Sequence, residues 1–313
     1  MKKISLVVPV FNEEGNLREF HRRVTEVMEN EDYDYSIVFV DDGSKDSSRV
    51  ILNELSKQDS HVEAYLLSRN YGHQMAITCG LDNADGDVVI SMDGDLQHPP
   101  ELIPDMLRLW EQGYEIVQTK RMATEDTGFV KNITSSAYYK VINALSKVEI
   151  TPGGSDFRLM DRIAVDAFKS YRERARFIRG LVSTLGFNVA VMEFVAPARF
   201  AGKSKFNLRK MLHFALDGIT AFSNIPLRWA FYLGIICGFA SLIILGHVLY
   251  VKLFTNDAVP GWATIAVSVL FFNAIQLMGI GILGEYIGRI FEEIKHRPLY
   301  LVARHIKTNS KDL

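Results

Sequence analysis

Two aspartates separated by one glycine, Asp93-Gly94-Asp95, follow a short apolar run, Val88–Ile90, that is typical of a buried strand. Carboxylate oxygens suit a hard divalent cation, and a cation held by two carboxylates keeps further positions open for phosphate oxygens. Gly94 allows the backbone to turn tightly between the two side chains. A polar loop after a strand explains the same residues equally well, so the elements around this motif must decide between the two interpretations.

The chain around this motif alternates between apolar runs and amphipathic segments, which predicts strands that alternate with helices. Strands are expected over Ile4–Val10, Ser36–Val40, Glu63–Leu67, Val88–Ile90, Ile116–Thr119 and Asn188–Val195. Helices are expected between the first four strands, over Leu17–Met28, 44–55 and His73–Asn83. Such alternation favours an α/β fold with a doubly wound, mostly parallel sheet, in which ligands bind beyond the carboxyl ends of the strands.

Polar side chains follow each of the first four expected strands, at the edge where such sheets bind their ligands. They are Asn12 and Glu14, Asp41 and Asp42, Arg69 and Asn70, and Asp93 and Asp95. Four polar groups that converge on one edge are difficult to explain by solvation alone. The sequence therefore favours a ligand site at this edge that includes the two aspartates of the Asp93-Gly94-Asp95 motif.

An acidic residue and a group of cations follow later in the same region. Asp156 comes after two glycines on a segment that we expect to be irregular, where a helix cap or a turn residue is the simpler interpretation. Further on, Arg199, Lys203 and Lys205 lie within seven residues of one another. Such a loop suits a phosphate ligand, and it equally suits the positively charged flank of a membrane segment.

Composition separates an α/β part from a membrane part. The formal net charge of −2 gives no electrostatic indication of a nucleic-acid partner. Residues 229–251 and 258–284 contain no Asp, Glu, Lys or Arg, and each run reaches the roughly 20 residues that a helix needs to cross a bilayer. The two cysteines, Cys79 and Cys237, lie in very different contexts and predict no disulfide.

The predicted organisation is an α/β domain over residues 1–205, an amphipathic juxtamembrane helix over 206–228, transmembrane helices over 229–251 and 262–284, and an amphipathic helix with a tail over 285–313. Lys and Arg are concentrated before the first apolar run and after the second. Because cytoplasmic flanks carry this excess of positive charge, we expect both termini and the α/β domain on the cytoplasmic side of the inner membrane.

Several motifs together resemble one family. They are Val7–Glu14, Val40–Asp46, Asp93–Gln97, Gly154–Met160, Ala201–Phe206 and Gly284–Arg289. The chain resembles the family 2 glycosyltransferases of the GT-A fold, and within them the polyprenyl-phosphate glycosyltransferases of the bactoprenol glucosyltransferase type. The first two motifs are typical of the whole family, whereas Gly154–Met160, Ala201–Phe206 and the two apolar runs narrow the resemblance to enzymes with lipid-phosphate acceptors.

The resemblance implies a role for each motif. The nucleotide sugar would contact Pro9, Phe11, Asn12, Glu14, Asp41, Asp42, Ser44, Asp93 and Gly94. A Mg²⁺ or Mn²⁺ ion on the donor diphosphate would be held by Asp93, Asp95 and Gln97. The acceptor phosphate would lie near Arg121, Arg199, Lys203, Ser204 and Lys205. Asp156 and Asp95 would be the catalytic carboxylates.

The implied activity is inverting transfer of a hexose, glucose or N-acetylglucosamine, from a UDP-sugar to undecaprenyl phosphate on the cytoplasmic leaflet, for modification of cell-envelope glycans. A GDP-mannose or UDP-aminoarabinose donor would leave the mechanism unchanged. A processive polysaccharide synthase is disfavoured because the glutamine of its Gln-x-x-Arg-Trp motif is missing before Arg228-Trp229. An inactive membrane-anchored binding protein is disfavoured by the intact carboxylates. Small residues in the spans and the resemblance favour a homo-oligomer, such as a tetramer.

Overall fold

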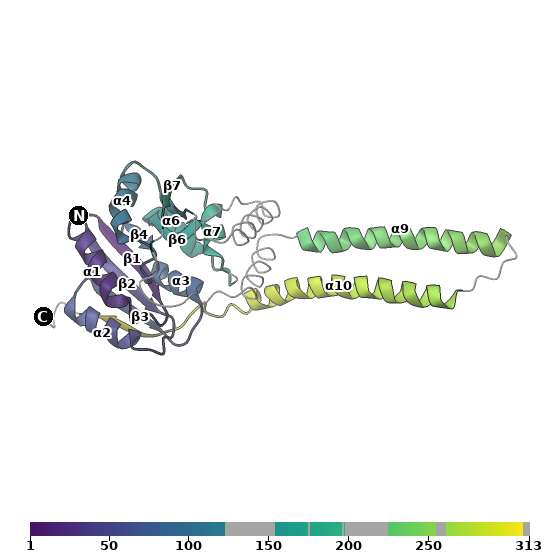
Figure 1. The fold of residues 1–313 in the computed structure, drawn as a ribbon, viewed down its shortest axis with the longest axis horizontal. Coiled ribbons are helices and arrows are strands. Elements are labelled where there is room, and N and C mark those ends of the chain that lie inside the picture. Colours follow the sequence, from purple (N-terminus) through teal and green to yellow (C-terminus); the bar gives the residue numbers. More distant parts are fainter. Residues whose placement is uncertain (123–153, 175, 196, 198–224, 255–260, 309–313) are drawn as a thin grey trace. The chain divides into compact units, whose positions relative to one another are not determined.

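The computed structural model describes residues 1–122, 154–174, 176–195, 197, 225–254 and 261–308. The chain divides into two compact units (Figure 1). One unit contains a β-sheet with its helices and includes the C-terminal segment from Arg297, and we call it the sheet unit. The other contains two long helices, and we call it the helical unit.

The sheet unit is built on one eight-stranded sheet with the strand order β7-β5-β6-β4-β1-β2-β3-β8. The strands are β1 Lys3–Val10, β2 Asp34–Asp41, β3 Val62–Leu67, β4 Val88–Ser91, β5 Ile116–Arg121, β6 Gly154–Asp161, β7 Val189–Phe194 and β8 Val302–Lys307. The four strands β4, β1, β2 and β3 pair in parallel and form the centre of the sheet. Their carboxyl ends therefore meet at one edge, as the sequence predicts.

Helices cover both faces of this sheet (Figure 1). They are α1 Leu17–Met28, α2 Ser48–Gln58, α3 His73–Asn83, the 3₁₀ turn η1 Pro100–Leu102, α4 Ile103–Glu111, α6 Arg162–Ser170 and α7 Ile178–Thr184. On one face, β1 residues such as Leu6 form a buried core with Phe20 of α1 and Leu52 of α2. On the other face, α3 lies so close to β1 that a Cβ on Gly80 would stand 2.1 Å from Cγ1 of Val7. The two-sided burial explains why these strands are apolar throughout.

The sheet differs from a purely parallel one at two places. Strand β6 pairs antiparallel with both β4 and β5, and it occupies the position between them. The two glycines before Ser155 predict an irregular segment at the start of β6, and Ser155, Asp156 and Arg158 are polar residues within the strand. All three side chains are nevertheless buried. The second difference is β8, which pairs antiparallel with β3.

The helical unit consists of α9 Ile225–Phe254 and α10 Trp262–Ile294, which pack against each other. Within the described residues, Phe271–Ile294 is the one helical segment long and apolar enough to cross a membrane, and Trp229–Ile244 is a shorter apolar segment. Two complete spans over 229–251 and 262–284 therefore stay a prediction. The predicted juxtamembrane helix over 206–228 lies outside the described residues except for its last four, which belong to α9.

The C-terminal segment contains a strand where the sequence predicts a helix followed by a tail. Helix α10 continues without a break to Ile294, and Val302–Lys307 then forms β8 in the sheet unit. The backbone amide of Ser68 donates a 2.9 Å hydrogen bond to the carbonyl of Leu301, which places the start of β8 at the carboxyl end of β3. The C-terminal strand thus enters the sheet at the edge that carries the polar loops.

Candidate active site

The Asp93-Gly94-Asp95 motif lies in the loop directly after β4. The Oδ1 atom of Asp93 is buried and accepts no hydrogen bond. The backbone amide of Gln97 donates a 3.1 Å hydrogen bond to Oδ1 of Asp95, so this second carboxylate stabilises a tight turn of the loop. A Cβ on Gly94 would stand 3.4 Å from Cγ1 of Val8. This is an ordinary van der Waals distance, so a Cβ at position 94 would meet no clash in this loop.

His98 supports this loop from behind. Its Nδ1 atom accepts a 2.9 Å hydrogen bond from the backbone amide of Asp93. Because Nδ1 is an acceptor, the ring carries its proton on Nε2, which donates to Oγ of Ser155 at 2.7 Å. The ring also stacks on Phe157 with a centroid distance of 5.2 Å. His98 thus connects the loop after β4 to strand β6.

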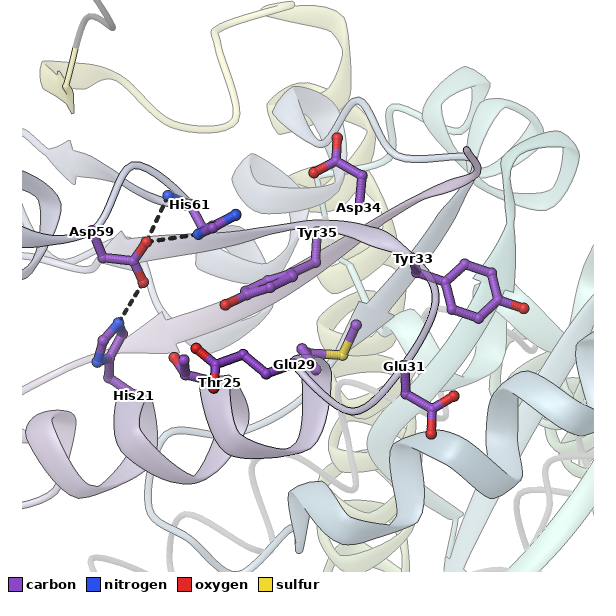
Figure 2. Close-up of a pocket in the computed structure, with 10 residues that line it drawn as sticks. His21, Thr25, Glu29, Glu31, Tyr33, Asp34, Tyr35, Asp59 and His61 are labelled. Atoms are coloured by element: carbon purple, nitrogen blue, oxygen red, sulfur yellow. Dashed lines mark hydrogen bonds and ion pairs between the residues drawn. The ribbon is translucent and has the colours of Figure 1, made fainter.

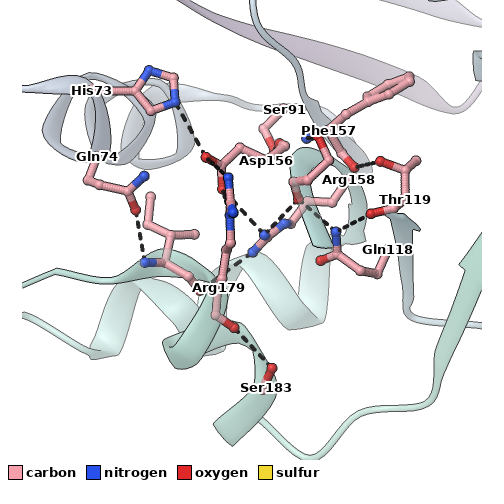
Figure 3. Close-up of polar contacts among 12 residues, drawn as sticks. His73, Gln74, Ser91, Gln118, Thr119, Asp156, Phe157, Arg158, Arg179 and Ser183 are labelled. Carbon is pink, nitrogen blue, oxygen red and sulfur yellow. Dashed lines mark hydrogen bonds and ion pairs between the residues drawn. The ribbon is translucent and has the colours of Figure 1, made fainter. Parts of the chain in front are cut away.

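Asp156 lies on β6 and is placed by its antiparallel pairing with β4. Ser91 pairs with Arg158 in the register of the two strands, and Oγ of Ser91 donates a 2.7 Å hydrogen bond to the backbone carbonyl of Asp156 (Figure 3). The side chain of Asp156 is only 8% exposed. A buried carboxylate requires compensating partners, and two arginines and a histidine surround this one.

The Asp156 carboxylate is held by Arg179 of α7. The Nε atom donates to Oδ1 at 3.0 Å and Nη2 donates to Oδ2 at 3.1 Å, so the two groups form a forked pair (Figure 3). Nη2 of the buried Arg158 lies 3.6 Å from Oδ1 as well. Burial alone raises the pKa of Asp156, but the charge of Arg179, with His73 and Arg158, outweighs burial and lowers this pKa well below its usual range. Asp156 is therefore a carboxylate at neutral pH.

His73, the first residue of α3, lies between the two acidic positions. Its Nε2 atom is 3.3 Å from Oδ1 of Asp93 and 3.5 Å from Oδ2 of Asp156. Burial acts to lower the pKa of His73, but the charge of Asp93 and the hydrogen bond to Asp156 outweigh burial and raise it to about 9. A single imidazole thus joins the loop after β4 to the buried carboxylate on β6.

The first two strand-end loops are joined by side-chain to backbone hydrogen bonds. Oγ of Ser44 accepts from the amide of Asn12 at 2.9 Å, and Oδ1 of Asn12 accepts from the amide of Lys45 at 2.8 Å. Glu14 accepts from the amide of Ser47 at 2.8 Å. Asn12 adopts a φ of +55°, which asparagine tolerates better than most residues. These hydrogen bonds hold the two loops together at the carboxyl edge of the sheet, next to the buried Pro9 and half-buried Phe11.

The carboxylates of Asp41 and Asp42 both accept hydrogen bonds from the protein itself. Asp41 is fully buried and accepts from the amide of Ser44 at 3.1 Å and from Nε of Arg49 at 2.6 Å. Asp42 accepts from the amides of Tyr71 and Gly72 at 2.6 and 2.9 Å. Burial, the largest influence, raises the pKa of Asp42. The two carboxylates therefore hold neighbouring loops in position, and Asp42 fixes the segment that leads into His73.

Comparison with known proteins identifies the family of the chain. Residues 5–168 match the family model described as glycosyl transferase family 2. The chain belongs to glycosyl transferase family 2. It is 43% identical over 309 residues to the uncharacterized glycosyltransferase YkcC of Bacillus subtilis (strain 168), which covers 99% of this chain and 96% of the relative.

This glycosyltransferase is also similar to a bactoprenol glucosyl transferase in sequence and to a glucosyl-3-phosphoglycerate synthase in fold. It is 41% identical over 307 residues to the SfII prophage-derived bactoprenol glucosyl transferase of Shigella flexneri, covering 98% of this chain and 99% of the relative. A glucosyl-3-phosphoglycerate synthase from Mycobacterium tuberculosis, solved with Mn²⁺, UDP and phosphoglyceric acid, superposes with a TM-score of 0.50 at 16% identity and covers 70% of this chain and 76% of that one. Its fold supports a GT-A type α/β fold with a mixed, mostly parallel sheet.

The predicted acceptor residues of the glycosyltransferase are described only in part. Arg121 ends β5 and is exposed. Its neighbour Lys120 pairs with Gly154 of β6, two residues before Asp156, so Arg121 lies at the same edge of the sheet. Arg199, Lys203, Ser204 and Lys205 lie outside the described residues.

A divalent cation fits the loop after β4, although no group of three or more His, Cys, Asp or Glu in the described residues is arranged to enclose a metal ion by itself. The fit rests on Oδ1 of Asp93, a buried carboxylate oxygen that accepts no hydrogen bond and faces Nε2 of His73 at 3.3 Å. Asp95 and Gln97 follow on the same loop and offer further oxygen atoms. Phosphate oxygens of a nucleotide sugar would complete the coordination, as is usual for Mg²⁺.

A cavity of about 550 Å³ lies away from this site, beside the amino ends of β2 and β3 (Figure 2). Its lining residues include His21, Tyr35, Asp59 and His61. Asp59 accepts hydrogen bonds from the rings of His21 and His61 at 2.8 Å each, and His61 stacks on Tyr35 with a centroid distance of 4.3 Å. These polar groups bond to one another, which makes the cluster a structural one.

Three functional residues of the site are absent from the sequence prediction. His73, His98 and Arg179 all contact the predicted carboxylates or their backbone. His98 carries a local signal, because it closes the Asp93 loop five residues later. Arg179 has no local signal, because it reaches Asp156 from a helix that begins 22 residues further along the chain.

Proposed function

We propose that this glycosyltransferase transfers a hexose, glucose or N-acetylglucosamine, from a UDP-sugar to undecaprenyl phosphate with inversion at the sugar carbon. The observation that carries the proposal is the placement of Asp93 and Asp156 on either side of His73. The first carboxylate suits a metal-bound donor diphosphate, and the second lies on the other side of the His73 ring nitrogen from it. The relatives that are bactoprenol glucosyl transferases support the choice of sugar and acceptor.

The donor half of the site is the loop after β4 with the two strand-end loops beside it. A bound Mg²⁺ or Mn²⁺ would neutralise the charge that grows on the leaving diphosphate. Asp93, Asp95 and Gln97 would hold the ion through oxygen atoms. The nucleotide would lie along the edge lined by Pro9, Phe11, Asn12, Glu14, Asp41, Asp42, Ser44 and Gly94.

The acceptor half is centred on Asp156. A phosphate monoester has a second pKa near 6 and is largely ionised at neutral pH, so its oxygen needs little help from a base. Because the pKa of Asp156 lies well below its usual range, this carboxylate is a poor proton acceptor. We therefore assign it to aligning the acceptor and stabilising positive charge at the anomeric carbon. Arg121, Arg199, Lys203, Ser204 and Lys205 would offset the charge of the acceptor phosphate.

The test is a panel of radiolabelled donors with the full-length enzyme in detergent and undecaprenyl phosphate. We expect label from UDP-glucose or UDP-N-acetylglucosamine in the lipid fraction, loss of transfer with EDTA, and recovery with Mn²⁺ or Mg²⁺. Asp95→Ala should stay folded and lose transfer, and Asp156→Asn should stay folded and keep only a small residual turnover. Asp166→Asn removes an exposed carboxylate of α6, 59% exposed, and is the matched control with unchanged turnover.

Each other outcome has a defined meaning. If label reaches the lipid only from GDP-mannose or a UDP-aminoarabinose donor, the proposed donor is wrong and the proposed mechanism stands. Full turnover of Asp156→Asn would overturn the site assignment. Arg199→Ala should raise the KM for the acceptor more than the KM for the donor, and the reverse would assign Arg199 to the nucleotide.

The proposed setting is the cytoplasmic membrane, with spans over 229–251 and 262–284 and with both termini and the catalytic unit in the cytoplasm. The positive-inside pattern of the flanks supports this topology. A reporter fused at residue 257 should appear outside the cell, and a cytoplasmic signal there would overturn the topology. Assembly into a homo-oligomer stays a prediction, which the mass of the detergent-solubilised enzyme would test.

A further inference from the structure

We propose that Arg179 is a positioning residue of the transfer reaction, which fixes the orientation of the Asp156 carboxylate through its forked pair of hydrogen bonds. This inference rests on the proposed function. Arg179 belongs to α7, a seven-residue helix outside every motif that carries the family resemblance. By fixing the Asp156 carboxylate, Arg179 would hold that negative charge in one orientation at the point where the sugar is transferred.

The forked pair determines the plane of the carboxylate. Nε and Nη2 of Arg179 meet Oδ1 and Oδ2 of Asp156 at 3.0 and 3.1 Å. A guanidinium offers its donors in a rigid planar fork, so two such bonds align the two groups in a way that one lysine ammonium cannot. The two hydrogen bonds lie on one side of the Asp156 carboxylate. They therefore also fix the direction in which the remaining lone pairs of its oxygens point.

Helix α7 is itself held firmly against the site. The amide of Ile178 donates a 2.9 Å hydrogen bond to Oε1 of Gln74, the residue after His73 on α3 (Figure 3). The side chains of Ile178 and Leu181 are buried, 2% and 1% exposed. Arg179 therefore reaches Asp156 from a helix whose start is fixed to the start of α3.

The other cations near Asp156 cannot replace this fork. Arg158 is 1% exposed, and its Nη2 donates to the carbonyl of Ser155 at 3.2 Å while lying 3.6 Å from Oδ1 of Asp156. His73 lies 3.5 Å from Oδ2 and also faces Asp93. Without Arg179 the carboxylate would be free to rotate toward either group. A misplacement of about 1 Å can cost a reaction about 100-fold in rate.

The experiment is steady-state kinetics of full-length Arg179→Gln and Arg179→Lys with UDP-glucose and undecaprenyl phosphate. We expect kcat to fall about 10- to 100-fold for Arg179→Gln, while the KM of each substrate stays within about twofold. Arg179→Lys keeps the charge and loses the fork, so its kcat should also fall. Arg172→Gln is the matched control, because Nη1 of Arg172 donates to both carboxylate oxygens of Asp82, at 2.9 and 3.0 Å, away from the site. It should keep the wild-type kcat.

A double-mutant comparison adds a readout that a merely structural role would not move. If Arg179 acts through Asp156, Arg179→Gln should not lower the residual turnover of Asp156→Asn any further. An unchanged kcat, or an acceptor KM that rises more than kcat falls, would overturn the proposal, the latter by making Arg179 a direct phosphate ligand.

Binding of UDP with Mn²⁺, measured by calorimetry, shows whether each variant is folded. If Arg179→Gln loses this binding, Arg179→Lys decides the question by the same criteria. Failure of the wild-type enzyme to transfer from any donor would overturn the proposed function instead. Normal wild-type transfer with normal turnover of both Arg179 variants would overturn only the positioning role.

Discussion

Nδ1 of His98 accepts a 2.9 Å hydrogen bond from the backbone amide of Asp93, and Nε2 of the same ring donates to Ser155 at 2.7 Å. One ring therefore sets the distance between the loop that carries Asp93 and the strand that carries Asp156. The stacking of this ring on Phe157 keeps it in place. His98 therefore connects the proposed donor half of the site to the proposed acceptor half without belonging to either.

His98→Phe should keep the stacking and lose both hydrogen bonds. The two bonds hold the Asp93 loop in position and contribute about 1 kcal/mol each. We therefore expect the affinity for UDP with Mn²⁺ to fall by up to about 30-fold, as measured by calorimetry. His61→Phe is the matched control, because His61, like His98, stacks on an aromatic ring, here that of Tyr35, but lines the distant cavity. Equal losses in the two variants would contradict a specific role for His98.

The pKa of about 9 for His73 predicts a pH dependence of stability in the metal-free enzyme. Because this folded-state value lies above the ordinary 6.5, the contribution of His73 is complete below pH 6.5 and is lost as the pH rises through 9. The Tm in EDTA should therefore fall more steeply between pH 7 and pH 9.5 for the wild type than for His73→Gln. Parallel curves would show that the charge of His73 does not stabilise the fold.

The C-terminal segment should stabilise the sheet unit through Tyr300. Its hydroxyl donates a 2.8 Å hydrogen bond to Oδ2 of Asp82 at the end of α3. Tyr300→Phe should lower the free energy of unfolding by about 1 kcal/mol, seen as a lower Tm in detergent. Tyr114→Phe alters an exposed ring, 38% exposed, and should leave the Tm unchanged.

Asp59 should matter for stability and not for transfer. Burial raises its pKa, but hydrogen bonds from His21 and His61 outweigh burial and lower it well below the usual range. Its contribution is therefore present above pH 4 and is lost as the pH falls through the lowered value. Asp59→Asn should cost about 1–2 kcal/mol at pH 7, a deficit that narrows in acid, while kcat stays at the wild-type value. A large loss of kcat would show that the cavity in Figure 2 communicates with the active site.

Much of the sheet was predictable because each signal is local. Apolar runs in β1, β2, β3 and β4 indicate strands buried on both faces, and the polar residues after them indicate the edge where a ligand binds. The antiparallel strand β6 was not predictable in this way. Ser155, Asp156 and Arg158 are buried polar residues of this strand that interact with one another and with their neighbours, so hydrophobic periodicity does not mark the strand.

The strand β8 escaped prediction for a different reason. Val302–Lys307 is a short strand at the edge of the sheet, and most of its residues are exposed. Its partner β3 precedes it by more than 200 residues in the chain. No pattern within the segment indicates that partner, because the pairing joins two segments that lie far apart in the chain.

The sequence by itself determined the family, the parallel centre of the sheet and the carboxylates Asp93, Asp95 and Asp156, because these depend on residue type and short spacing. Only the tertiary structure decided what surrounds them. It brought His73 of α3 and Arg179 of α7 to the same carboxylate, although 106 residues separate them in the numbering. A buried carboxylate needs several cationic or hydrogen-bonding partners, and only the packing of distant elements supplies them. The sequence thus predicts the position of the acid, and the fold supplies the cations that lower its pKa and keep it ionised.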